Sequence, residues 1–270
     1  MTAWALGDST VPPFMLAGTR ASMVLVVMGY FLFRPLPEQF LKLLFVALCV
    51  GPIHLGLLYT GLQTASASGA SILSQALIPM ATLLSVVWLK EHIGWRRSLA
   101  IGGALIGVVI MIYEPGALSF DPGLLFVLGA YVSMAVGTVV IRRIPDVDWR
   151  VYVAWTAVLV LILSTFMSFL FERNHAEIWR VDKVPLLIAA LYAAVAISVV
   201  AHGQYFRLLQ TYPVNRVVPL SILVTVFATV FGVLLLDEVL YRRYIIGAAL
   251  ILPCVWIIAR RGTPAPAELD

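Results

Sequence analysis

Long apolar runs follow one another along nearly the whole chain, each about as long as a membrane-spanning helix. A helix needs about 20 apolar residues to cross the hydrocarbon core of a bilayer. Runs such as LILSTFMSFLF lack the apolar–polar alternation of a transmembrane β-strand. Charged residues make up 12% of the sequence, about half the share in an average soluble domain. The pattern excludes a soluble enzyme or nucleic-acid-binding domain and predicts an all-α polytopic membrane protein.

Nine segments qualify as membrane spans, and short connectors rich in proline and charged residues separate them. They are 12–33, 41–62, 66–89, 98–113, 122–141, 150–171, 184–206, 215–236 and 244–259. One set of alternate connectors holds 12 Lys and Arg residues and the other holds 5. Because basic loops stay in the cytoplasm, we expect a multi-pass inner-membrane protein with a cytoplasmic C-terminus.

Two stretches of the chain repeat one another. A shift of 147 residues aligns 56–91 with 203–238 without a gap, and 11 of the 36 positions are identical. Some identities are polar, such as Gln63 with Gln210, which an apolar composition does not produce by chance. An odd number of spans between corresponding helices gives the copies opposite orientations, as in many secondary transporters. The repeat predicts two halves that open a midplane site to either side in turn; a duplicated scaffold is the alternative.

The repeated strings resemble the two signatures of the EamA family in the drug/metabolite transporter superfamily. They are YTGLQTASASGASILSQALIPMATLLSVVWLKEHIGWRRSLAIGGALIGVVIMI and VNRVVPLSILVTVFATVFGVLLLDEVLYRRYIIGAALIL. The resemblance implies a first repeat over 1–118, a second over 119–260 and a disordered cytoplasmic tail over 261–270. Family members usually have ten helices in two sets of five, and the segment from Val11 looks like the second of these. We therefore expect that the first helix is missing upstream; a protein that works with nine is the alternative.

Three titratable residues within the predicted spans are candidates for binding substrate or protons. Arg20 lies roughly 12 Å into the first span at the standard helical rise. Its side chain either extends to the outer interface or donates two hydrogen bonds to a substrate carboxylate. His54 and His202 lie in corresponding helices of the two repeats, one residue out of register, and either pack as buried side chains or relay protons. In an α-helix Ser198, His202 and Tyr205 would share one face.

Small polar residues form a stripe on the third predicted span, at Ser68, Ser71, Gln75 and Thr82, and Asn215 is the repeat equivalent of Ser68. Such residues often hold membrane helices together through hydrogen bonds. The amides of Gln75 and Asn215 need several partners and are costly to leave unsatisfied. We therefore expect these two amides to contact substrate.

Aromatic and acidic residues supply the remaining candidates. Tyr131 is expected to form an aromatic wall of the substrate cavity, with core packing as the alternative. Glu91 and Glu238 end their helices, and we expect each to form an ion pair across the following turn, with a gate as the alternative role. The expected partners are Arg96 or Arg97 for Glu91, and Arg242 or Arg243 for Glu238.

Motifs of enzymes and of metal or nucleotide sites are absent from the sequence, and no Asp or Glu lies deep within a predicted span. We expect no cofactor and no metal, and we expect Cys49 and Cys254 to behave as small apolar residues. The predicted function is a secondary active transporter (permease) that exports a small polar or amphipathic metabolite, such as an amino acid, with protons as the coupling ion. The alternatives are uptake of a metabolite or vitamin by the same fold, and a membrane scaffold.

Overall fold

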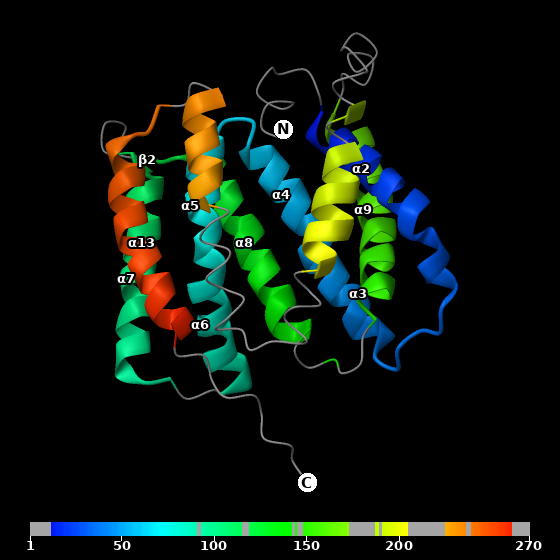
Figure 1. Ribbon diagram of the computed structural model, residues 1–270, viewed down its shortest axis with the longest axis horizontal. Coiled ribbons are helices and arrows are strands. Elements are labelled where there is room, and N and C mark those ends of the chain that lie inside the picture. Colours follow the sequence, from blue (N-terminus) through cyan, green and yellow to red (C-terminus); the bar gives the residue numbers. More distant parts are fainter. Residues whose placement is uncertain are drawn as a thin grey trace. The chain divides into compact units, whose positions relative to one another are not determined.

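The structure, a computed structural model, describes residues 12–90, 93–114, 119–141, 144, 148–172, 187–188, 191–204, 225–235 and 239–260. Within these ranges it is mostly helical (Figure 1). Six of them are long and apolar enough to cross a membrane: Phe14–Phe33, Phe40–Gly61, Ala67–Trp88, Trp95–Ile112, Pro122–Ile141 and Trp149–Phe171. These are the first six predicted spans, and the all-α polytopic membrane class is confirmed.

Several spans change helix type along their length. The helical elements are α2 (Pro13–Met28), η1 (Gly29–Phe33), α3 (Phe40–Leu48), η2 (Cys49–Ile53), α4 (His54–Gly61), α5 (Ala67–Leu73), η3 (Ser74–Ala76), α6 (Leu77–Leu89), α7 (Trp95–Ile112), α8 (Pro122–Ile141), α9 (Trp149–Phe171), η5 (Ala193–His202), Thr225–Leu235 and α13 (Arg242–Arg260). Of these, η1 and η3 are 3-10 helices, whereas η2 and η5 are π-helices. The loop after α7 forms two short antiparallel strands, β1 (Tyr113–Glu114) and β2 (Ser119–Phe120), which the sequence analysis did not predict.

Local sequence accounts for several helix ends. The Ser66 hydroxyl accepts a hydrogen bond from the Gly69 N–H at the start of α5, at 3.1 Å. The Asp148 carboxylate accepts one from the Arg150 N–H at the start of α9, at 2.9 Å. Helix α6 ends at Lys90, whose φ of 53° lies in the left-handed region that favours glycine.

The chain divides into two compact units, each of which draws on both repeats. The first consists of Met1–Thr64 with Val136–Phe206, and the second of Ala65–Ala135 with Arg207–Asp270. A unit is therefore not the same thing as a repeat. The boundaries predicted for the two repeats stay a prediction, since the units divide the chain by packing and not by sequence similarity.

In the first unit α2 packs against α9. Leu16 near the start of α2 shares an apolar cluster with Val160, whereas Met28 at its end meets Val153 and Ala157. The two helices therefore run antiparallel, and each buries a stripe of small and branched apolar residues against the other.

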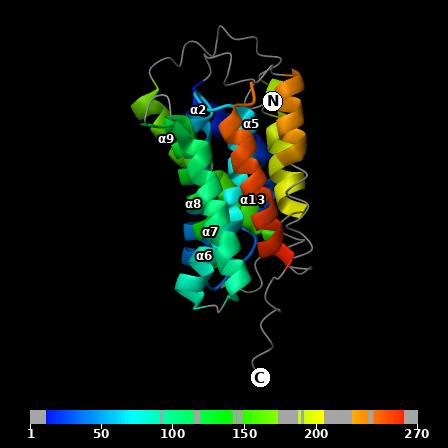
Figure 2. The ribbon, with the colours of Figure 1, turned by 90° about the vertical axis from the view of Figure 1, so that its left-hand side faces the viewer.

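In the second unit α7 and α13 run side by side and antiparallel, as both views show (Figure 1, Figure 2). Glycines allow this close approach. A methyl group added at Gly107 would lie 2.8 Å from Cγ1 of Ile251 and 3.1 Å from the carbonyl oxygen of Gly247. One added at Gly247 would collide with the Met111 side chain. Small residues at helix crossings are typical of membrane proteins, where packing and not apolar burial drives association.

Candidate functional site

Arg20 lies at the centre of a buried polar cluster in the first unit. It sits midway along α2, and its side chain is only 8% exposed. Its Nε donates a hydrogen bond to Oγ of Ser198 at 2.9 Å, and its Nη1 donates one to the phenolic oxygen of Tyr59 at 3.0 Å. Of the two orientations considered for Arg20, the structure shows the inward one, because an arginine that reached the outer interface would be exposed.

In the described part of the chain, apolar side chains pack against Tyr59, one of the two partners of Arg20. Tyr59 on α4 is 2% exposed and belongs to the same buried cluster as Leu16, Ala17 and Ala21 of α2. A charge in such an environment is poorly screened, so its interaction with an opposite charge is several times stronger than in water. A charge inside a membrane protein is also costly to maintain, and such groups usually mark a functional path.

The partner Ser198 comes from a π-helical segment. Within η5 the Ser198 hydroxyl donates a hydrogen bond to the carbonyl oxygen of Ala193, five residues earlier, at 3.0 Å. The shift of 147 residues that aligns the repeats carries η2 (Cys49–Ile53) onto 196–200, which falls inside η5. Both repeats therefore depart from α-helical geometry at the same place. Departures of this kind occur often at functional sites.

The histidine candidates lie on the elements that border this cluster. His54 is buried at the start of α4, directly after η2. His202 ends η5, and its side chain, like Tyr205, falls outside the described residues. Because η5 is a π-helix, the α-helical spacing expected for Ser198, His202 and Tyr205 does not fix which of them share a face.

The start of α2 is anchored by a residue distant in sequence. Glu172, at the end of α9, accepts hydrogen bonds from the backbone N–H groups of Phe14 at 2.7 Å and Met15 at 3.2 Å. Ser168 donates a third hydrogen bond to the same carboxylate at 2.6 Å. A negative charge at a helix N-terminus is favoured by the helix dipole, and Pro12 supplies no side-chain cap of its own. Glu172 thus fixes the helix that carries Arg20.

A second polar cluster lies within the second unit. Gln75 and Thr225 are both buried, and the Gln75 amide donates a hydrogen bond to the Thr225 hydroxyl. Thr225 in turn donates to the carbonyl oxygen of Ser71 at 3.3 Å. Gln75 therefore joins two helices, and Thr225 could not be predicted because no sequence pattern links it to Gln75. Asn215, the other amide expected to contact substrate, lies outside the described residues.

The other residues of the predicted polar stripe lie on the helices before and after η3, Ser68 and Ser71 on α5 and Thr82 on α6. Ser68 is buried, and Tyr131 on α8 is hydrogen-bonded to the Ser74 side chain. Thr82 donates a hydrogen bond to the carbonyl oxygen of Ile78, on its own helix, at 2.8 Å. Among the residues that the structure describes, no group of three His, Cys, Asp or Glu side chains could hold a metal ion.

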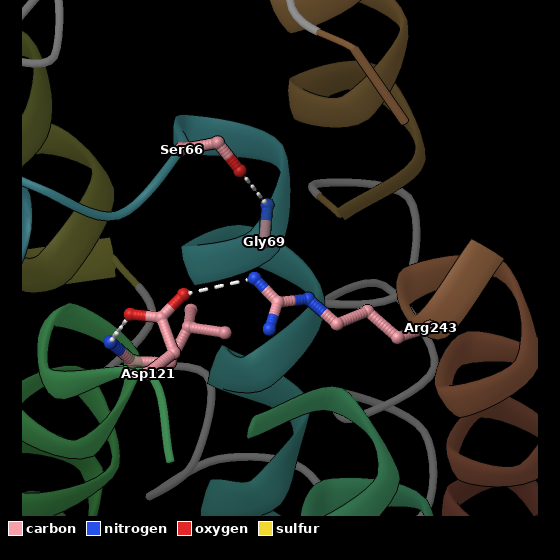
Figure 3. A network of polar contacts seen from close by, with 5 residues as sticks. Ser66, Gly69, Asp121 and Arg243 are labelled. Atoms are coloured by element: carbon pink, nitrogen blue, oxygen red, sulfur yellow. Dashed lines mark hydrogen bonds and ion pairs between the residues drawn. The ribbon is translucent and has the colours of Figure 1, made fainter. Parts of the chain in front are cut away.

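An ion pair links α8 to α13 in the second unit (Figure 3). Arg243 donates a hydrogen bond from Nη2 to Oδ2 of Asp121 at 3.1 Å, and Oδ1 accepts the N–H of Leu124 at 3.1 Å. The Arg243 guanidinium lies 5.3 Å from the ring centre of Tyr244. The sequence did not predict this pair; the ion pair expected there joins Glu238 to Arg242 or Arg243. Both glutamates of that prediction, Glu91 and Glu238, lie outside the described residues.

The model of the EamA-like transporter family matches residues 3–113 and 121–260. The chain belongs to this family. The two matched segments cover nearly the whole sequence, so membership extends to both halves of the protein and confirms the resemblance drawn from the repeated strings.

Relatives share about a quarter of their residues with this EamA-like chain. A protein of Escherichia coli (strain K12) named "Probable amino-acid metabolite efflux pump" is 27% identical over 93% of this chain and 87% of its own length. A chloroplastic WAT1-related protein of Arabidopsis thaliana is 28% identical over 91% of this chain and 62% of its own length. A protein in a solved crystal structure, 20% identical, matches with a TM-score of 0.64 over 95% of this chain and 91% of its own, which shows a shared fold.

Proposed function

We propose that this protein is a secondary active transporter that exports a small polar or amphipathic metabolite, such as an amino acid, by alternating access. Membership of the EamA-like transporter family gives the general transport role. The efflux pump of Escherichia coli, named for amino-acid metabolites, supports the substrate class and the outward direction.

The observation that carries the proposal is the buried cluster around Arg20. A scaffold gains nothing from a cation held midway along a membrane helix, because such a charge is costly to bury. The cluster draws residues from α2, α4 and η5; α4 directly follows the π-helix η2, and η5 contains the repeat equivalent of η2. A pair of similar, oppositely oriented repeats supports alternating access. The arrangement therefore supports transport over a scaffold role.

Membrane orientation is part of the proposal. We place the C-terminus in the cytoplasm and the protein in the inner membrane. The basic residues Arg34 and Arg150 support this, since they lie at one end of α2 and α9. Arg34 pairs with Asp148 at 3.4 Å, and the Arg150 guanidinium lies 5.5 Å from the ring centre of Trp149. Basic side chains are enriched at the cytoplasmic ends of membrane spans, whereas aromatic side chains mark both interfaces.

Purified protein reconstituted into liposomes tests the proposal. We expect release of preloaded radiolabelled amino acids, faster with an imposed pH gradient and slower after an uncoupler is added. The variants His54→Ala and His202→Ala, compared at several pH values, test whether these histidines relay the protons. Unchanged pH dependence in both would exclude the relay, and absence of flux with every amino acid would exclude amino-acid export.

A further inference from the structure

We infer that the transported molecule carries a carboxylate and that the Arg20 guanidinium, together with the Tyr59 hydroxyl, binds it. This inference rests on the transport function proposed above and specifies the chemistry of its substrate. It follows from the hydrogen-bonding capacity of the cluster, from its charge, and from its apolar surroundings.

The Arg20 guanidinium has more N–H donors than its hydrogen-bond acceptors occupy. A guanidinium carries five N–H groups. Among the described residues, Ser198 takes the one on Nε and Tyr59 takes one on Nη1. Both N–H groups of Nη2 and one of Nη1 are left for a further acceptor. Adjacent donors on Nη1 and Nη2 match the two oxygens of a carboxylate.

The two hydroxyls differ in what they can still donate. Ser198 uses its single O–H to reach the carbonyl oxygen of Ala193. The Tyr59 oxygen accepts from Arg20, and among the described contacts its own O–H has no acceptor. A hydroxyl donates one hydrogen bond while it accepts others. Tyr59 can therefore donate to the same carboxylate that Arg20 binds.

Charge balance indicates an anionic group with a single charge. Both partners of Arg20 in the described structure are neutral. Two acids of the first unit, one at each end of the α2–α9 pair, have other partners: Glu172 binds the start of α2 and Asp148 binds Arg34. One buried cation is balanced by one carboxylate, whereas a phosphate dianion would leave an uncompensated negative charge in apolar surroundings.

Transport by counterflow separates this inference from the proposed function. Liposomes preloaded with an unlabelled compound take up the same radiolabelled compound whatever the coupling ion or natural direction. The probes are L-leucine, L-threonine and L-phenylalanine, each paired with its amide, which keeps the side chain and amino group but lacks the carboxylate. We expect counterflow with at least one amino acid and none with its amide.

Substitutions at Arg20 provide the second measurement. Loss of a charge-assisted, two-point hydrogen bond weakens binding by about tenfold to a hundredfold. We expect Arg20→Gln to raise the KM for the amino acid by at least tenfold. Arg20→Lys keeps the charge but loses the pair of adjacent N–H donors, and should raise KM less. Tyr59→Phe should raise KM by a smaller factor. Arg34→Gln, which removes an exposed arginine of the same unit, is the matched control and should leave KM unchanged.

The possible outcomes are distinct. Equal counterflow of an amino acid and its amide, or a folded Arg20→Gln variant with wild-type KM, overturns the carboxylate site and leaves transport standing. Absence of counterflow with all six probes overturns amino-acid export and the carboxylate site together. Because the comparison of acid with amide uses the wild-type protein, it holds even if an Arg20 variant does not fold.

Discussion

Replacing Asp121 tests how much one carboxylate contributes to the stability of the second unit. Its Oδ1 accepts the Leu124 N–H at the start of α8, and its Oδ2 accepts from Arg243 at the start of α13. Asp121→Ala removes both interactions. Asp121→Asn keeps an oxygen for the Leu124 N–H but removes the charge opposite Arg243.

The expected loss of stability follows from these two contacts. A side-chain helix cap contributes about 1 kcal/mol. Removing one partner of a fully buried ion pair costs about 3 to 5 kcal/mol. The Arg243 and Asp121 side chains are 14% and 13% exposed, so the pair is not fully buried. Arg243 also retains its contact with the Tyr244 ring in the variants, so the loss of stability is smaller than for a fully buried pair. We take about 2 kcal/mol for the pair, below that buried-pair range. The sum for Asp121→Ala is then about 3 kcal/mol and the loss for Asp121→Asn about 2 kcal/mol.

Thermal unfolding of the purified variants in detergent, followed by tryptophan fluorescence, measures the effect. A loss of about 3 kcal/mol corresponds to a Tm lower by roughly 6 to 12 °C for a chain of this size class. Asp121→Asn should fall between Asp121→Ala and the wild type. Arg34→Ala breaks an exposed ion pair, in which the Arg34 side chain is 48% exposed, and should shift Tm by no more than about 2 °C. If Asp121→Ala unfolds at the wild-type temperature, the ion pair and the cap do not stabilise the unit, and the reasoning is refuted.

Three further substitutions test other parts of the fold through the same Tm measurement. Gly107→Ala should destabilise the protein by about 1 to 3 kcal/mol because the added methyl group meets Ile251 and the backbone. The control Gly102→Ala, whose methyl group meets no atom within 4 Å, should leave stability unchanged, and equal effects of the two variants would exclude close packing as the cause. Lys90→Gly should raise stability by about 0.5 to 1 kcal/mol by relieving the left-handed backbone, and a lower Tm would contradict that explanation. Glu172→Gln, which weakens the anchor of α2, should cost about 1 kcal/mol, and an unchanged Tm would show that the charge at this helix end is not needed.

Span positions could be predicted because the length of an apolar run is a local property. The bilayer requires about 20 apolar residues for each crossing, and both Phe40–Gly61 and Trp149–Phe171 satisfy that requirement in sequence alone. The same holds for the repeat, whose copies can be aligned residue by residue. The change of helix type within a span was not predictable, since the apolar pattern of η5 fits a π-helix and an α-helix equally well.

Partners distant in sequence account for the remaining differences. Arg20 and its acceptor Ser198 are 178 positions apart, and Asp121 and Arg243 are 122 apart. The sequence shows that Arg20 lies within a span but not whether its side chain turns inward. It places Arg243 near Glu238, and so favours a local ion pair, which lies outside the described residues, but it gives no sign of the pair with Asp121 from another helix. A single sequence contains no signal for such long-range pairs.

The division of each repeat between the two units has a consequence for synthesis at the ribosome. Helix α2 leaves the ribosome long before its packing partner α9, and α7 long before α13. An N-terminal half expressed alone would hold one side of each main helix pair and neither complete unit. The early helices, including the one that carries Arg20, must therefore stay in the bilayer without their main packing partners until α9 and α13 are made.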